Sequence, residues 1–339
     1  LNRKAGLAPS ISVTAQVLRE AAFRNTRDPF VEWANGLKWD GKPRIDKWLT
    51  YYGGAELNEY NSLVGRLFLM SAMARGLDPG CKVDTMMILE GPQGLKKSTL
   101  VRVLCGSEWF SDQVGEIHGK DASQAVQGIW IMEIPEMDKF QRAEANAVKA
   151  FLSRLFDRYR PPYGRNFIKR ERRCVFFGTI NPDGAGYFGD TTGARRFLPV
   201  KVVSIDIDGL RADRDQLWAE AKFYYDRGDR YWIDDDDKAL VSPEQEKRRN
   251  EDVWEPRILE WLEDRTFGWK VDHDRMWKAF SSGDVMWQCL NIELKSQKQV
   301  DKNRVAKILK MFGCQDVQHK NGIKGRSWEY EPKKAEAEE

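Results

Sequence analysis

Short apolar runs alternate with amphipathic segments through the middle of the chain. Three runs predict buried strands, namely "TMMILE" (85–90), "GIWIMEIPE" (128–136) and "RRCVFFGTIN" (172–181). Apolar residues at three- and four-residue spacing predict helices over 97–106, 143–159 and 214–228. Strands that alternate with helices favour a mostly parallel sheet covered on both faces. The pattern therefore predicts an α/β core over residues 81–235.

Helical patterns also flank this core. Residues 1–80 are predicted to be mostly helical, with a turn at Asp40-Gly41. An acidic run at 234–237 favours a solvated linker over 236–252. Residues 253–330 show helical periodicity at 254–264, 281–293 and 301–312, and Asn321-Gly322 then marks a hairpin. Helices followed by a basic hairpin predict a winged-helix-like domain, and 331–339 are expected to form a disordered tail.

Composition narrows the functional classes. The net charge is only +3, so a nucleic-acid surface must come from local clustering of basic residues. The five cysteines are far apart in the sequence, which argues against a zinc site or a disulfide framework and favours reduced thiols. No signal peptide or membrane-length apolar run is seen, so we expect a cytosolic location. Because the first residue is Leu rather than Met, we expect a fragment or a trimmed chain, and the sequence does not show whether an upstream domain is missing.

The stretch "LEGPQGLKKSTLVRVL" (89–104) resembles the phosphate-binding pattern G-x-x-x-x-G-K-[ST], with Lys96 in place of its second glycine. Only Lys97 is followed directly by a hydroxyl, so we predict that Lys97 binds phosphates and Ser98 binds Mg²⁺. Lys96 either points outward or adds charge near the phosphates, and by itself the loop fits a structural glycine turn equally well. The candidate ATP-binding residues are Gly91, Pro92, Gln93, Gly94, Leu95, Lys96, Lys97, Ser98 and Thr99.

Polar residues that follow the other strands supply candidate catalytic groups. Glu133 and Glu136 lie in the second half of the second run, where a carboxylate can serve Mg²⁺ and the attacking water, but the sequence does not assign these roles between them. Asn181 ends the third run and is either a sensor of the γ-phosphate or a turn residue before Pro182. Arg195 and Arg196 form either a salt-bridged edge or an arginine finger for a neighbouring subunit.

Seven blocks of the sequence resemble, in the same order, the virulence-associated protein E family of phage and mobile-element proteins. They are "LKWDGKPRIDKWL", "EGPQGLKKSTL", "WIMEIPEMD", "VKAFLSRLFDRYRPPYGR", "RRCVFFGTINPDG", "GARRFLPV" and "RDQLWAEA", and they span about residues 28–228. The family belongs with superfamily 3 helicases and the AAA+ class of P-loop NTPases. The resemblance implies that Lys97 is the Walker A lysine, Glu133 and Glu136 the Walker B acids, and Asn181 the sensor. It places the finger region at Arg195 and Arg196. Lys96 departs from the family pattern, which more often has glycine, and this puts the hydrolysis rate in question.

Two basic segments are candidates for DNA binding. The segment 153–173 interleaves arginines and lysines with aromatic residues, a pattern that suits single-strand tracking and base stacking, although a helix-end charge cluster is the alternative. The resemblance implies that this segment enters the central pore of a ring. The segment 293–328 is also basic and suits duplex phosphates, or else a solvated face of a protein-docking domain. The candidates are Arg160, Tyr163, Arg165, Lys169, Arg170, Lys302, Arg304, Lys320, Lys324 and Arg326.

These patterns together predict an ATP- and Mg²⁺-dependent DNA helicase or translocase that acts in phage or mobile-element replication. ATP would bind between subunits of a homo-oligomer, most simply a hexameric ring, in the bacterial host cytosol. A primase or another replication protein is the expected partner. One alternative is a non-catalytic or weakly catalytic DNA-binding initiator or scaffold, and a second is a P-loop phosphotransferase.

Overall fold

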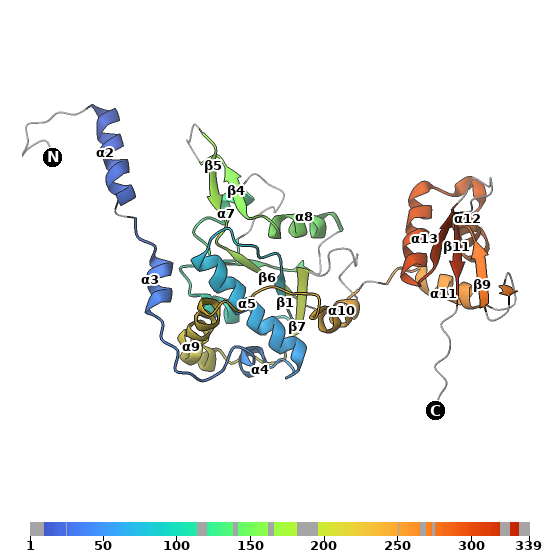
Figure 1. Ribbon diagram of the computed structural model, residues 1–339, viewed down its shortest axis with the longest axis horizontal. Coiled ribbons are helices and arrows are strands. Elements are labelled where there is room, and N and C mark those ends of the chain that lie inside the picture. The colour runs from blue at the N-terminus through green and yellow to red at the C-terminus, as the bar shows by residue number, and fades with distance from the viewer. Residues whose placement is uncertain are drawn as a thin grey trace, which may run out of the picture. The chain divides into compact units, whose positions relative to one another are not determined.

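A computed structural model describes residues 10–24, 26–113, 121–137, 142–161, 166–181, 196–249, 251–264, 269–272, 275–318 and 326–331. The chain divides into two compact units, residues 1–250 and 251–339, which are described separately below (Figure 1).

A five-stranded sheet forms the centre of the first unit, and every strand in it is parallel to its neighbours. The order across the sheet is β2-β3-β6-β1-β7. β6 therefore lies between β1 and β3, although it follows both in the sequence. The strands are β1 Met86–Glu90, β2 Phe110–Ser111, β3 Ile131–Ile134, β6 Val175–Ile180 and β7 Phe197–Lys201. The prediction of a parallel α/β core is confirmed.

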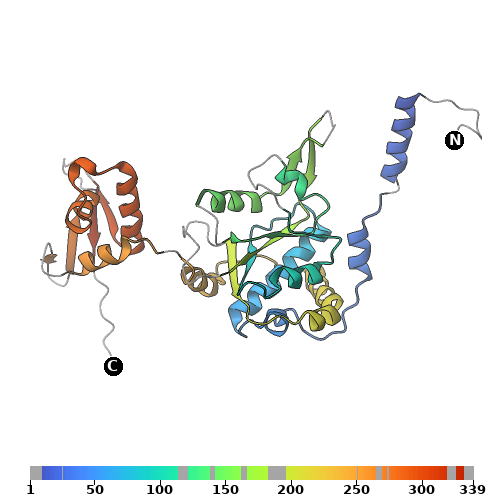
Figure 2. The same ribbon diagram turned by 180° about the vertical axis from the view of Figure 1, so that it is seen from behind.

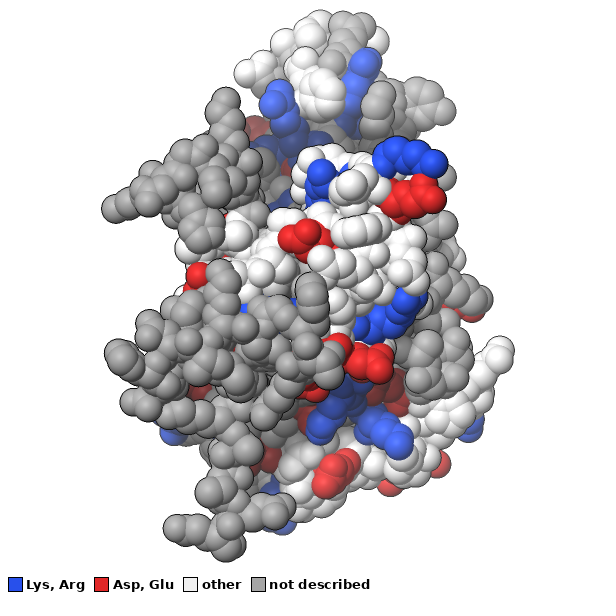
Figure 3. Space-filling model, turned by 90° about the vertical axis from the view of Figure 1, so that its right-hand side faces the viewer, with Lys and Arg blue, Asp and Glu red and all other residues white. Residues whose placement is uncertain are grey.

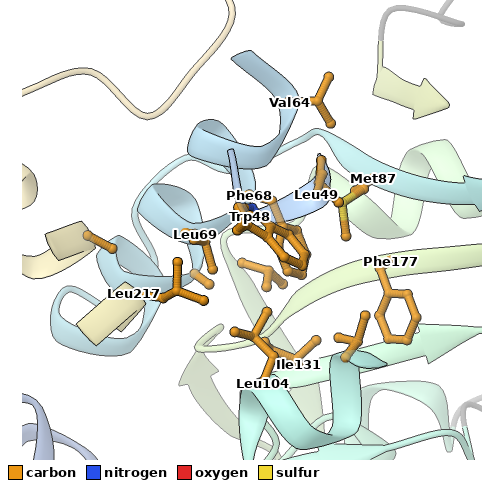
Figure 4. Close-up of a cluster of buried hydrophobic side chains, with 14 of the residues drawn as sticks. Trp48, Leu49, Val64, Phe68, Leu69, Met87, Leu104, Ile131, Phe177 and Leu217 are labelled. Carbon is orange, nitrogen blue, oxygen red and sulfur yellow. The ribbon is translucent and has the colours of Figure 1, made fainter. Parts of the chain in front are cut away.

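Helices cover both faces of this sheet, because alternate residues of each buried strand face opposite sides. In β1, Met87 and Leu89 belong to one buried cluster, whereas Met86 and Ile88 belong to the other. The first cluster includes side chains of α5 Glu59–Leu77, α6 Lys97–Cys105 and α9 Ile207–Asp226, and Figure 4 shows part of it. The second includes side chains of α7 Ala122–Ala125 and α8 Arg142–Leu152.

The N-terminal helices are α2 Ile11–Arg24, α3 Pro29–Gly36 and α4 Trp48–Gly53. The sequence pattern predicts residues 1–80 as a region separate from the core. In the structure, however, Phe30 of α3, Trp48 of α4 and Phe68 of α5 all pack in the first buried cluster beside β1. Much of this region therefore contributes to the same hydrophobic core as the sheet.

A hairpin replaces the end of one predicted helix. The helical pattern over 143–159 ends at Leu152, and β4 Phe156–Tyr159 then pairs antiparallel with β5 Ile168–Glu171. Figures 1 and 2 both show this hairpin standing out from the sheet. The helix prediction is wrong here because Asp157 pairs with the distant Arg172, and such a tertiary contact outweighs local helical periodicity.

Buried ionic groups anchor the base of this hairpin. Arg172 is 1% exposed and donates two hydrogen bonds to Asp157, and it also donates to the carbonyl of Phe151. Arg75 of α5 is fully buried and donates to the carbonyls of Arg172 (2.8 Å) and Arg154 (3.3 Å). Burial lowers the pKa of Arg75. These bonds fix the hairpin to α5 through charged groups that have no access to water.

The segment predicted as a linker over 236–252 contains helix α10 Lys238–Glu246, which packs against β7. Gln245 donates to the carbonyl of Phe197 (2.9 Å), and Val241 joins the first buried cluster. Just beyond the helix, Arg248 pairs with the buried Glu90 at the end of β1 (2.8 Å). Most of this segment therefore belongs to the first unit.

The second unit has a four-stranded antiparallel sheet in the order β10-β11-β9-β8. Its core includes Ile258, Val285, Ile308 and Trp328. Strands β8 and β9 are absent from the sequence prediction, and the helix predicted over 281–293 is instead a short α-helical turn followed by a π-helix. The elements are α11 Glu255–Glu263, β8 Trp269–Asp272, β9 Arg275–Phe280, α12 Ser282–Asp284, the π-helix η3 Val285–Cys289, the 3-10 helix η4 Leu294–Ser296, α13 Gln299–Met311, β10 Gln315–Gln318 and β11 Arg326–Tyr330. Across the parts of both units that the structure describes, no helix has the length and apolar character needed to cross a bilayer.

Candidate functional site

The loop between β1 and α6 bends sharply at the carboxyl edge of the parallel sheet. Gly94 has a φ of +81°, and a Cβ on Gly91 would lie 2.7 Å from the carbonyl oxygen of Val202. Lys96 also has a positive φ, of 68°, immediately before the first turn of α6. A tight glycine turn that leads into a helix N-terminus directs backbone N–H groups toward one point, which suits phosphate.

Lys97 and Asn181 meet at this edge. The Lys97 ammonium donates to Asn181 Oδ1 (2.8 Å) and to the carbonyls of Gly91 (2.6 Å) and Pro92 (3.0 Å). Its side chain is buried, only 7% exposed. The two residues follow β1 and β6, which are adjacent in the sheet, so their contact results directly from the strand order.

Glu133 of β3 receives two hydroxyl groups on one oxygen. Ser98 Oγ donates to Glu133 Oε1 (2.7 Å), and so does Thr179 Oγ1 (2.9 Å). The other oxygen, Oε2, is buried without a hydrogen-bond partner among the described residues. Burial raises the pKa of Glu133, and the two hydroxyl bonds partly oppose that effect. A buried carboxylate oxygen that lacks a donor is free to bind a cation.

Thr179 is not among the site residues predicted from the sequence, although the sequence carries a signal for it. Residues two apart on a strand face the same side, so Thr179 and the predicted Asn181 project from one side of the β6 chain. Thr179 contacts Glu133, and Asn181 contacts Lys97. A polar residue inside an otherwise apolar strand, two positions before a predicted site residue, would have indicated it.

Ser98 and Glu133 fit the binding preferences of Mg²⁺. Both offer oxygen, the element that Mg²⁺ prefers, and Mg²⁺ is commonly held by one or two protein oxygens together with phosphates and waters. Within the described ranges, no group of three or more His, Cys, Asp or Glu side chains could form a complete metal cage. A site completed by the phosphates of a nucleotide therefore fits better than a dedicated protein cage.

The other predicted catalytic residues are less closely gathered. Glu136 is exposed, lies two residues beyond β3 and has a positive φ of 51°. Arg196 is half-buried and donates through Nε to Ser153 Oγ (3.1 Å) of the same chain. Arg195 lies outside the described residues. The assignment of a finger to Arg195 or Arg196 stays a prediction.

One face of the β4–β5 hairpin combines basic and aromatic side chains. Arg158 lies over the ring of Phe167 (5.3 Å), and Lys169 lies over the ring of Phe156 (4.1 Å). The two rings are 63% and 46% exposed, respectively. Arg158 and Lys169 are also directly opposite one another in the strand register, although like charges in that position are unfavourable. A bound anion would reduce the repulsion between these two positive charges.

Several predicted DNA-binding residues can be placed individually. Arg160 and Arg170 are exposed at the hairpin, whereas Tyr163 and Arg165 lie outside the described residues. In the second unit, Lys302 is half-exposed, Lys320 and Lys324 are not described, and Arg326 is described only as part of β11.

Arg304 is already engaged within the second unit. Its guanidinium makes two hydrogen bonds to Asp252 (2.6 and 2.7 Å) and stacks over the ring of Trp254 (3.8 Å). The described surface presented in Figure 3 likewise shows basic and acidic side chains interspersed with uncharged ones. The structure thus gives Arg304 a role in holding the start of α11, and the hairpin face is the stronger candidate for nucleic acid.

The virulence-associated protein E-like domain matches residues 34–250 of the chain. No curated protein sequence matches. Among solved structures, an apo A form of the NrS-1 C-terminal region has a TM-score of 0.45 and 14% identity, over 69% of this chain and 59% of that one. The chain thus spans less than two thirds of that structure. A second A-form apo structure, of NrS-1 residues 305–718, has a TM-score of 0.44 and 15% identity, over 87% and 77% of the two chains.

Proposed function

This chain belongs to the virulence-associated protein E-like domain family, and we propose that it is an ATP-driven DNA motor of phage or mobile-element replication. The observation that carries the proposal is the convergence of Lys97, Ser98, Glu133 and Asn181. These four residues follow or belong to three adjacent strands, and they make direct contacts of 2.7 to 2.8 Å in two pairs. A lysine, a hydroxyl and a buried carboxylate around a glycine turn are the groups that nucleotide hydrolysis needs.

Each of these residues has a distinct role in the proposed reaction. Lys97 turns its ammonium from the loop carbonyls to the β- and γ-phosphates, and Asn181 orients it or senses the γ-phosphate. Ser98 and Glu133 would hold Mg²⁺, which neutralises charge that develops on the phosphates. Glu136 is exposed at the same sheet edge and is our candidate for polarising the attacking water.

We extend the proposal to a ring, most simply a hexamer, in which ATP binds between subunits. Arg195 or Arg196 of one subunit would reach the nucleotide of the next, and the β4–β5 hairpin would contact single-stranded DNA in the pore. A primase or another replication protein is the proposed partner. The experiment that tests the motor is ATP turnover with and without single-stranded DNA. A phosphotransferase would show no stimulation by DNA, and a non-catalytic initiator would show no turnover under either condition.

The raised pKa of Glu133 gives the proposed metal site a pH dependence. The folded protein favours the neutral acid to a higher pH than the ordinary 4.5 of glutamate, whereas Mg²⁺ binding needs the carboxylate. We expect the affinity for Mg²⁺–ATP to fall as the pH drops through this raised pKa. Thr179→Val removes a hydrogen bond that lowers the pKa, so it should move the fall to higher pH.

Calorimetric titration of Mg²⁺–ATP over a pH series measures this effect. The same nucleotide is used for every protein, so its own titration cancels when the profiles are compared. Glutamine cannot ionise, so Glu133→Gln should remove the contribution of this residue to the pH dependence of the affinity. Only the pH dependence that comes from the nucleotide should then remain. Identical profiles for the wild type and Thr179→Val would show that this hydrogen bond does not tune the carboxyl.

The hairpin face should contribute most of the affinity for single-stranded DNA in the first unit. A double variant in which glutamine replaces both Arg158 and Lys169 should bind more weakly. The slope of log K plotted against log [salt] should also become shallower, by about 0.7 for each charge removed. Fluorescence anisotropy with an oligothymidine at several salt concentrations measures both quantities.

The matched control removes one arginine and one lysine elsewhere. Arg211 and Lys238 are each 62% exposed and pair with acids three residues away in the sequence. Their replacement by glutamine should leave the salt slope unchanged. If the control and the hairpin variant behave alike, the hairpin is not the DNA-binding surface.

A further inference from the structure

Two residues with a strained backbone conformation lie at the edge of the sheet where the nucleotide is proposed to bind. Among the described residues, three that are not glycine have positive φ, namely Lys96 (68°), Glu136 (51°) and Asn291 (57°). Asparagine adopts this left-handed conformation readily, but lysine and glutamate do not. The two unfavourable cases are both charged, and they follow β1 and β3 at the same edge. Strain of this kind persists where it serves a function.

Lys96 and Lys97 are adjacent in the sequence but lie in opposite environments. Lys97 is buried, and its ammonium is bonded to the loop and to Asn181. Lys96 is exposed and makes no side-chain cap to α6, and no described carboxylate forms an ion pair with it. Lys96 is therefore an exposed cation at the residue that precedes the first turn of α6, a helix whose N-terminus already favours anions.

Glycine at position 96 would remove the strain. Glycine adopts positive φ without steric cost, and it is the residue that the phosphate-loop pattern has there. A lysine in this conformation therefore makes the loop less stable without improving its packing, because the side chain is exposed. What the lysine adds is a positive charge at the point where phosphates are proposed to bind.

We propose that Lys96 is a second phosphate-binding cation that makes the site favour nucleoside triphosphates over diphosphates. The inference rests on the proposed nucleotide site. Its reason is electrostatic, since a triphosphate carries more negative charge within reach of the loop and gains more from an added cation. Because Lys96 is exposed, the gain must also weaken as salt is raised.

The test separates charge from strain by comparing three substitutions at this position. Lys96→Gly and Lys96→Asn both remove the charge and relieve the strain, whereas Lys96→Arg keeps both. Lys82→Asn is the matched control, because this exposed lysine lies four residues before the amino end of β1, at the opposite edge of the sheet from the loop. Each protein is measured for its Tm without nucleotide and for its affinity for ATP and ADP.

We expect Lys96→Gly and Lys96→Asn to weaken ATP binding by about three- to ten-fold and ADP binding less, while raising the Tm by about 2 to 4 °C. Lys96→Arg should match the wild type in all three measurements, and Lys82→Asn should leave the preference for ATP unchanged. Variants that are more stable yet bind less tightly are the signature of a strained residue kept for its charge.

Other outcomes overturn the inference in distinguishable ways. Unchanged ATP affinity in the Gly and Asn variants would mean that Lys96 serves no phosphate, while the nucleotide site itself would stand. Equal losses for ATP and ADP would remove the proposed selectivity. A lower Tm for both variants would contradict the strain that motivates the inference. If the folded wild type binds neither nucleotide, the proposed function fails together with this inference.

Discussion

Replacing Lys97 with alanine is expected to lower the rate of ATP hydrolysis by roughly 10²- to 10³-fold, the usual loss when one preorganised donor to a developing charge is removed. Lys97 is the buried cation of the loop, and its ammonium lies within 2.6 to 3.0 Å of three oxygen acceptors around the glycine turn. Alanine leaves the transferring phosphoryl group without this charge. The measurement is steady-state release of phosphate, with and without single-stranded DNA.

The neighbouring lysine provides the control for this experiment. Lys96→Ala removes the same charge one residue earlier, so it should reduce turnover far less than Lys97→Ala if Lys97 is the essential cation. Single-strand binding by the hairpin should survive in Lys97→Ala, which shows that the variant is folded. Equal turnover by the wild type and Lys97→Ala would remove the basis for an ATP-driven motor.

Arg172→Leu is expected to destabilise the first unit by about 3 to 5 kcal/mol, because it leaves the charge of Asp157 buried and unpaired. The side chains of Arg172 and Asp157 are 1% and 0% exposed, respectively. A double variant, Arg172→Met with Asp157→Leu, removes both charges and should recover much of the loss. Urea denaturation followed by tryptophan fluorescence gives the free energies of unfolding.

An exposed ion pair is the comparison that shows how much burial adds to the loss of stability. Arg102 and Asp112 lie 2.7 Å apart, but their side chains are 46% and 44% exposed. Arg102→Leu should therefore cost only about 0 to 1 kcal/mol. If Arg172→Leu costs no more than that, the buried pair does not hold the hairpin base. If the double variant is no more stable than Arg172→Leu, the unpaired charge is not the cause.

The parallel core could be predicted because its signals are local. The apolar run before Gly91 and the amphipathic segment after it specify β1 and α6 with little help from the rest of the chain. The end of α8 could not be predicted in this way. Residues 153–159 continue a helical pattern, but Asp157 finds its partner 15 residues away, and strand pairing overrides the pattern.

The candidate site shows the same division between local and long-range information. The register of the loop singles out Lys97 and Ser98, and position at the end of a strand singles out Glu133 and Asn181. The sequence does not show that β6 separates β1 from β3, which is what lets Thr179 reach Glu133. Nor does it show that Lys96 adopts a left-handed conformation, because only the path of the loop imposes that φ.

The position of β6 has a mechanical consequence. Its carboxyl end touches both halves of the candidate site, through Thr179 to Glu133 and through Asn181 to Lys97. Its amino end is separated from β5 by only residues 172–174, and Arg172 among them is locked to Asp157 of β4. β6 itself is six residues of extended chain, about 20 Å long, and only three residues join it to β5. We therefore expect a displacement of the hairpin to be transmitted along β6 to Lys97 and Glu133 together.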